Sequence, residues 1–238
     1  TDGAIATPAT TTRPVDWVFL VWALGVVVVA TRFAIGHLVA RRIVARGSKP
    51  CEAWEHAIGE AEHKTGIRAV IRVSPAIDAP AVTGILAPVV VVPASSSSWG
   101  AERKLSVLLH ELAHVAAHDL DVQLLASIVC SLHWFNPLAW LATSRLRLER
   151  ELAADEAVLR SGMRASTYAA DLLAIAGPAP LGTVAVAEKP ITSRITAILS
   201  KERPAVIGPK AAAAFALGTT AMTLGLACTS TTSPAAEP

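Results

Sequence analysis

Residues 110–119 read HELAHVAAHD, a polar stretch in a chain that is otherwise rich in alanine, valine and leucine. On a helix, residues four apart project from the same face, so His110 and His114 can direct two imidazole nitrogens at one ion. Glu111 lies beside them, displaced around the helix, and can reach a water on that ion without being a ligand. This HExxH arrangement predicts one divalent metal ion, Zn²⁺, held by the two histidines.

A catalytic zinc site commonly takes a third protein ligand, and the stretch ELAAD at 151–155 offers the best candidate. Glu151 and Asp155 are four apart on an expected helix and therefore face the same way. We predict that Glu151 completes a two-histidine, one-glutamate site. Asp155 is expected to accept the second N–H of a ligand histidine and to fix its tautomer.

Other residues compete for the third position. Longer HExxH motifs place a third histidine six residues after the second, but Leu120 stands there. His118 lies too far along a straight helix to close the site easily and is more simply a surface residue. Glu149 and Glu156 point away from the face that carries the predicted third ligand.

The predicted site favours peptide hydrolysis. Zinc lowers the pKa of a bound water and polarises a carbonyl, and Glu111 would take the water proton and pass it to the leaving amine. Tyr168 and His133 are candidate donors to the carbonyl oxyanion, although core packing is the simpler explanation for both. The substrate could add as a strand along an edge such as residues 84–93.

The composition favours a membrane protein, because 53% of the residues are hydrophobic and only 17% are charged. Residues 15–40 include the apolar run WVFLVWALGVVVVA and predict a transmembrane helix. Basic residues follow it, which places the next segment in the cytoplasm and residues 1–14 in an extracytoplasmic loop. The same reasoning predicts a transmembrane helix at 204–228 and a short extracytoplasmic tail at 229–238.

Residues 41–203 are expected to form a cytoplasmic-facing domain that is mainly α with a small β-sheet, an α+β fold. The alternating stretch IRAVIRV predicts a strand at 67–73, and GILAPVVVVP predicts a second at 84–93, on an edge because of its prolines. Helical patterns cover most of the remainder: Glu52–Thr65 ending at Gly66, 101–120, 143–161, and 164–203 with a loop at 177–183.

The apolar run at 122–142 cannot be one straight crossing. Its length would separate His114 from Glu151 by roughly 30 Å, whereas one ion needs both within about 2 Å. Proline ends or kinks a helix, so the Asn136-Pro137 pair is the natural break. The segment is therefore predicted to be a membrane-dipping hairpin.

Charge and cysteine content exclude other classes. The net charge is +2 without a dense basic patch, so we expect no direct binding of nucleic acid. The three cysteines are widely spaced and form neither a disulfide framework nor a CxxC metal site.

Four stretches in order, VTGILAPVVVVPAS, LLHELAHVAAHD, HWFNPLAWLA and RLERELAADEAVL, resemble the membrane-embedded zinc metallopeptidases typified by the beta-lactam-sensing antirepressors of resistance operons. The similarity covers roughly residues 15–228. Their peptidase domain is gluzincin-like and lies between membrane helices. The combination of HExxH with WFNP and ELAAD is much more specific than HExxH alone.

The resemblance implies a cell-membrane, multi-pass peptidase with His110, His114 and Glu151 as zinc ligands and Glu111 as base. It also implies signalling in which the protein cleaves itself and a cytoplasmic DNA-binding repressor. Sensing members carry two earlier helices and a large extracellular penicillin-binding domain, and neither is present in these 238 residues.

Two other functions stay open at the level of the sequence. The first is a non-catalytic membrane signalling scaffold with a closed structural zinc site, in which His118 or Asp155 would be the fourth ligand. The second is a general membrane quality-control protease with a broad range of substrates.

Overall fold

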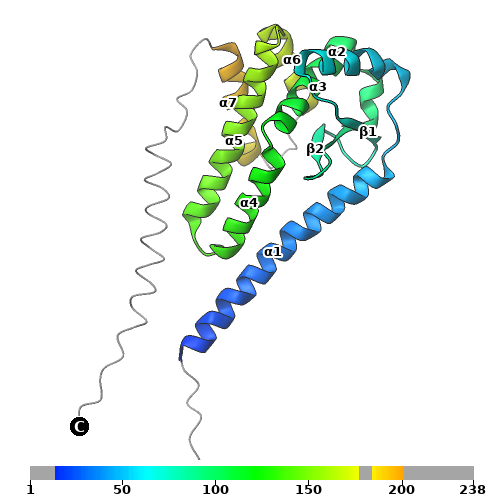
Figure 1. The fold of residues 1–238 in the computed structure, drawn as a ribbon. Helices are drawn as coiled ribbons and strands as arrows, with labels where there is room; N and C mark the ends of the chain where they lie inside the picture. Colours follow the sequence, from blue (N-terminus) through cyan, green and yellow to red (C-terminus); the bar gives the residue numbers. More distant parts are fainter. Residues whose placement is uncertain (1–13, 177–183, 201–238) are drawn as a thin grey trace, which may run out of the picture. The chain divides into compact units, whose positions relative to one another are not determined.

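The computed structural model describes residues 14–176 and 184–200, and the expected α+β fold is confirmed within them (Figure 1). Helices dominate, and one small sheet lies between them. The helices are α1 (Pro14–Arg46), α2 (Glu55–Thr65), α3 (Ala101–Ala116), α4 (Asp119–Leu132), α5 (Pro137–Arg160), α6 (Ala165–Ala176) and α7 (Val184–Leu199), with short 3₁₀ turns at Glu52–Trp54 and Ala94–Ser98.

The sheet has three strands in the order β1 (Val70–Ser74), β3 (Val89–Pro93), β2 (Ala81–Thr83). β1 runs parallel to β3, and β2 runs antiparallel to it. The prediction of an edge strand at 84–93 is therefore wrong, because the strand in that segment is central and buried at Val90–Val92. Pro88 precedes the strand and Pro93 is its last residue, so neither removes a backbone N–H from the middle of the strand. The edge strands are β1 and β2, and the sequence did not predict β2.

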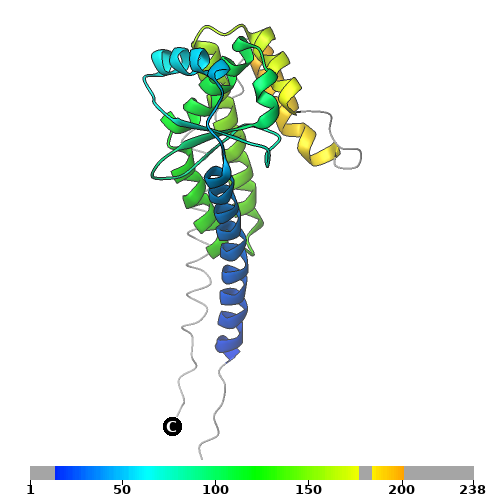
Figure 2. The same ribbon diagram turned by 90° about the vertical axis from the view of Figure 1, so that its right-hand side faces the viewer.

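One hydrophobic core joins the sheet to the helices that cover it (Figure 2). Trp54, Leu108 and Val158 are fully or almost fully buried in it. The predicted end of α2 at Gly66 is confirmed, since this residue takes a left-handed conformation with φ of 72° that a glycine adopts without steric cost.

The helix that carries the HExxH motif is shorter than the predicted 101–120. α3 ends at Ala116, and α4 starts at Asp119 after a bend of 59°. His118 forms the joint with φ of 54°, an uncommon conformation for a residue with a β-carbon. The bend redirects the chain directly after the motif.

The predicted break at Asn136-Pro137 is confirmed. α4 ends at Leu132 and α5 begins at Pro137, where the Asn136 side chain accepts a hydrogen bond of 2.9 Å from the Leu138 N–H. This is an N-cap followed by a proline in the first turn, a strong helix start. α4 and α5 pack against each other as a hairpin, and α5 returns the chain to α3 (Figure 1).

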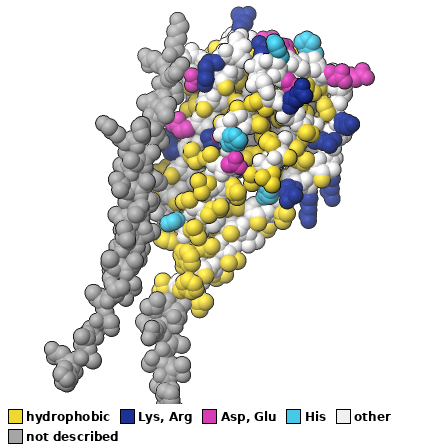
Figure 3. Space-filling view, viewed as in Figure 1, with side chains coloured by type: hydrophobic (Ala, Val, Ile, Leu, Met, Phe, Trp, Pro, Cys, Tyr) yellow, Lys and Arg dark blue, Asp and Glu magenta, His cyan; other side chains and the backbone are white. Residues whose placement is uncertain are grey.

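Helix α1 is long and apolar enough over Trp17–Arg46 to cross a membrane, and it extends beyond the predicted 15–40. The α4–α5 hairpin lies along it, and Trp22 and Trp134 donate hydrogen bonds across the contact to the carbonyls of Leu132 and Trp22. Hydrophobic side chains cover this part of the surface, whereas most charged groups lie nearer the sheet (Figure 3). The predicted helix at 204–228 and the segments 1–13 and 229–238 lie outside the described residues.

Candidate metal centre

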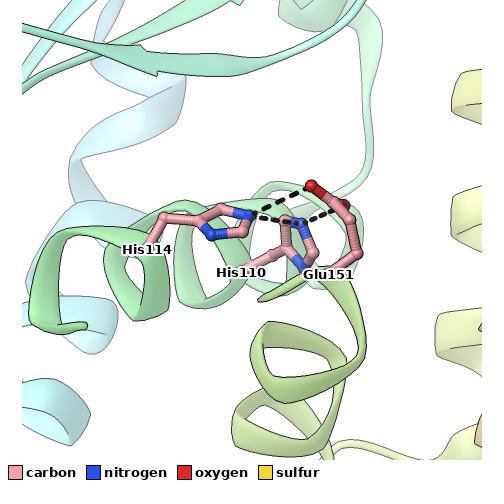
Figure 4. Close-up of side chains that lie close together, drawn as sticks. All are labelled: His110, His114 and Glu151. Atoms are coloured by element: carbon pink, nitrogen blue, oxygen red, sulfur yellow. Dashed lines mark hydrogen bonds and ion pairs between the residues drawn. The ribbon is translucent and has the colours of Figure 1, made fainter. Parts of the chain in front are cut away.

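Three predicted ligands meet at the interface of α3 and α5 (Figure 4). His110 and His114 project from one face of α3, and Glu151 reaches them from α5. The two Nε2 atoms lie 3.2 Å apart. The Glu151 carboxylate oxygens lie 3.5 Å from Nε2 of His110 and 3.7 Å from Nε2 of His114.

These separations fit a tetrahedral metal ion. Zinc binds imidazole nitrogen and carboxylate oxygen at about 2.0–2.2 Å, so two ligands of a tetrahedron stand roughly 3.3 Å apart. The two imidazole nitrogens have nearly this spacing, and each lies within 3.7 Å of one Glu151 oxygen, a different oxygen for each histidine. Two neutral imidazoles with one carboxylate suit zinc. Among the described residues, this is the one cluster of histidine, cysteine and acidic groups with metal-binding spacing.

The three predicted ligands line a cavity with a volume of about 430 Å³, and Glu111 lines it with them. The side chain is buried, and burial raises the pKa of its carboxyl above the ordinary value. A carboxyl group with a raised pKa beside a metal site has the properties of a general base that must take up and release a proton. The cavity is bounded by β2 and by the helices α3, α4, α5, α6 and α7.

The groups that contact His110 come from two other helices, α5 and α6. Its Nδ1 lies 3.2 Å from Asp155 and 2.9 Å from the hydroxyl of Tyr168, which itself donates to Asp155. Burial lowers the pKa of His110, but its hydrogen bonds to Asp155 and Glu151 outweigh burial and raise the pKa to about 9. Nε2 is left facing Glu151. The contact predicted for Asp155 is thus present in the structure.

Arg194 of α7 contacts both carboxylates of α5. It donates to Asp155 at 2.7 and 2.8 Å, and its Nη1 lies 2.8 Å from Glu151. Burial raises the pKa of Glu151, but His110 and Arg194 outweigh it and lower the pKa to about 2. The same two partners hold the pKa of Asp155 below its usual range against burial. Both carboxylates therefore stay ionised.

His114 has its own carboxylate partner. Its Nδ1 lies 2.5 Å from the buried Asp119, the first residue of α4. The other oxygen of Asp119 lies 3.0 Å from Arg150 Nε, which makes no hydrogen bond, so this contact is an ion pair. Sequence reasoning missed these two residues and Arg194. Asp119 is visible in the sequence five residues after His114. On a straight helix, however, its side chain would point away from the His114 ring.

Some predicted candidates are not brought to the site. His133 lies at the far end of α4, about 20 Å of helix from the motif, and its ring contacts the Val129 carbonyl. The Tyr168 side chain lines the cavity, and its hydroxyl lies on the Nδ1 side of His110 rather than toward Glu151. His118 is exposed and pairs with Asp121, as expected for a surface residue.

Two imidazoles and a carboxylate beside a buried glutamate define the site class of the HExxH metallopeptidases. The chain matches the family described as BlaR1 peptidase M56 over residues 2–198 and belongs to it.

Two named relatives are regulatory proteins. The regulatory protein BlaR1 of Bacillus licheniformis is 28% identical over 147 residues, which are 60% of this chain and 24% of that protein. The methicillin resistance mecR1 protein of Staphylococcus aureus is 30% identical over 85 residues, 35% of this chain and 14% of that protein. The chain thus spans a quarter or less of each relative's length.

Proposed function

We propose that this protein is an integral-membrane zinc metalloendopeptidase that hydrolyses peptide bonds at the cytoplasmic face. The observation that carries the proposal is the convergence of His110, His114 and Glu151, whose ligand atoms lie within 4.8 Å of one another. Membership of the peptidase family supports the same chemistry. A buried glutamate in the adjoining cavity supplies the remaining catalytic group.

Each residue has a defined role in this proposal. His110, His114 and Glu151 would hold the zinc ion, which when bound would supply an acidified water and polarise the scissile carbonyl. Glu111 takes the proton of that water and delivers it to the leaving amine. Asp155 and Arg194 keep His110 and Glu151 in one orientation through the contacts described above.

The substrate binds as an additional strand beside β2. This strand is the edge of the sheet next to the cavity, and Ala81 and Val82 line the cavity wall. An edge strand has unpaired backbone groups that an extended peptide can satisfy. The expected location at 84–93 is thereby replaced by β2.

The biological role we propose is regulatory cleavage, of the protein itself and of a cytoplasmic DNA-binding repressor. The names of the relatives, one a regulatory protein and one a methicillin resistance protein, support such a role.

In the membrane, α1 and the α4–α5 hairpin are the parts in contact with lipid. A general quality-control protease has the same site, and differs by cleaving many unrelated proteins.

A structural zinc scaffold is less well supported. A closed site needs a fourth protein ligand. Within the described residues the ligand cluster contains three, and the alternatives His118 and Asp155 contact Asp121 and Arg194 instead.

The test is cleavage by the zinc-loaded full chain, reconstituted in lipid, of itself and of a repressor encoded near its gene, followed by mass spectrometry. Glu111→Gln should bind zinc normally and lose activity by a factor of about 100 or more. Glu102→Gln, at an exposed position on the same helix, is the matched control and should cleave as the wild type does. Equal cleavage by Glu111→Gln would overturn the assignment of the base.

A further inference from the structure

The first residue of α4 and the residue before Glu151 form a buried ion pair directly behind His114. Asp119 has one carboxylate oxygen at 2.5 Å from His114 Nδ1 and the other at 3.0 Å from Arg150 Nε. Only 7% of the Asp119 side chain and 18% of the Arg150 side chain are exposed. Buried charges are retained only where each has a partner, and here the partners form a chain that ends on a metal ligand.

The contact between Asp119 and His114 depends on the bend in the backbone. On a continuous helix, residues five apart are roughly 140° apart around the axis and about 7.5 Å apart along it. An aspartate at that spacing could not reach the His114 ring. The left-handed conformation of His118, with φ of 54°, ends α3 and turns Asp119 back toward the site. A residue with a β-carbon takes this conformation at a cost in free energy. Here the strained conformation places Asp119 against the ring of His114.

The two charged residues also belong to the two legs of the membrane hairpin. Asp119 starts α4, which leads to the tip, and Arg150 lies on α5, which returns from it. Their ion pair joins the legs at the end next to the site. At the tip, the Trp22 and Trp134 contacts attach the hairpin to α1.

We propose that Asp119 and Arg150 are positioning residues for His114, and that they link the hairpin to the metal centre. Asp119 accepts the Nδ1–H of His114 and so fixes the tautomer that leaves Nε2 free to bind metal. Arg150 holds the Asp119 carboxylate in place and sets the separation of the two hairpin legs. The inference rests on the proposed metal site, but it concerns residues that do not touch the ion.

The test measures metal binding rather than cleavage. The full chain in lipid is stripped of metal, and its Zn²⁺ affinity is determined by competition with a chromogenic chelator. The visible absorption spectrum of the Co²⁺-loaded protein reports ligand geometry. Asp119→Asn, which is nearly isosteric, should weaken Zn²⁺ binding about 10–100-fold and change the Co²⁺ spectrum. Asp121→Asn, an exposed aspartate two residues further along, should leave both unchanged.

Arg150 is tested in the same assay. Arg150→Gln should weaken Zn²⁺ binding less than Asp119→Asn does, and Arg147→Gln, at an exposed position on the same helix, should have no effect. The double variant Asp119→Asn/Arg150→Gln should bind Zn²⁺ about as well as Asp119→Asn alone, because both changes break one chain of contacts. If the loss of Zn²⁺ affinity in the double variant equals the product of the losses in the two single variants, Asp119 and Arg150 act independently and the proposed coupling is wrong.

The outcomes separate this inference from the proposed function. If the wild type binds no Zn²⁺, the proposed metal site is wrong. If the wild type binds Zn²⁺ and Asp119→Asn binds it equally well with an unchanged Co²⁺ spectrum, the positioning role is wrong and the metal site stands. Thermal unfolding of each metal-free variant shows whether it is folded. Asp119→Glu, which keeps the charge, should regain part of the affinity.

Discussion

The two nitrogens of His110 face different groups, and this asymmetry defines the site at the scale of single residues. Nε2 faces Glu151, whereas Nδ1 faces Tyr168 and Asp155. His114 repeats the arrangement with Asp119. A carboxylate behind each imidazole orients the ring before any metal arrives, so less conformational freedom is lost on binding.

Tyr168 should contribute to stability rather than to chemistry. Tyr168→Phe removes the hydroxyl that donates to Asp155, but Arg194 still contacts that carboxylate. We expect the free energy of unfolding of the metal-free protein to fall by about 1 kcal/mol. Chemical denaturation measures this change. Ser144→Ala removes an exposed hydroxyl and serves as control. A Tyr168→Phe protein as stable as this control would contradict the account.

The residues of the metal-binding cluster could be predicted from the sequence because their spacing within each helix is local. Two histidines four apart, and two acids four apart, each share a helix face in any fold. Arg194 and the Arg150–Asp119 pair could not be predicted, since their contacts depend on how separate helices pack. The orientation of the candidate oxyanion donors could not be predicted for the same reason, because residue type alone does not say which way a side chain points.

At the scale of elements, the decisive feature is the turn between α4 and α5. A straight crossing would have carried Glu151 away from α3, and Asn136-Pro137 prevents it. The break was predictable because proline and an N-cap asparagine act locally. The bend at His118 was not, since no glycine or proline marks it and the stretch AHVAAHDL has an ordinary helical pattern.

The N-cap of α5 is open to a direct test. Asn136→Ala removes the side-chain oxygen that accepts the Leu138 N–H. The loss should cost about 1 kcal/mol of unfolding free energy, while Asn136→Ser, which can still cap, should cost less. Denaturant titration in detergent micelles compares the two variants. Equal stability of Asn136→Ala and the wild type would show that the cap does not maintain the turn.

The sheet shows a different limit of sequence reasoning. The strand at 67–73 was predicted correctly as β1, shifted toward its C-terminal end, but the edge was assigned to the wrong strand. Prolines suggested an edge at 84–93, yet Pro88 precedes β3 and Pro93 is its last residue. β2 has only three residues, too few for a pattern of alternation.

At the scale of the whole molecule, the exposed apolar side chains of α1 and the α4–α5 hairpin lie apart from the candidate metal site. The described part of the chain has one helix able to span a membrane, or two if the bent α3–α4 pair counts as one span. Side chains of the hairpin such as Leu125, which is 63% exposed, would meet water if no lipid covered them. Exposed apolar area of this extent indicates a membrane or another partner.

A charge on the hairpin should therefore be costly. Leu125→Arg places a cation among the apolar side chains of α4, and should reduce stability in lipid by about 2–3 kcal/mol if the position lies in the bilayer core. Val70→Arg, at a 54% exposed position in β1, is the control and should be tolerated. The measurement is the unfolding free energy in bicelles. Equal tolerance of both substitutions would contradict the membrane placement of the hairpin.

X-ray absorption spectroscopy of the zinc-loaded full chain tests the central claim most directly. We expect one zinc per chain, with two imidazole nitrogens, one carboxylate and an exchangeable water at about 2.0–2.2 Å. Glu151→Gln should bind zinc much more weakly. A fourth protein ligand in place of the water, or unchanged coordination after Glu151→Gln, would contradict an open catalytic site built from α3 and α5.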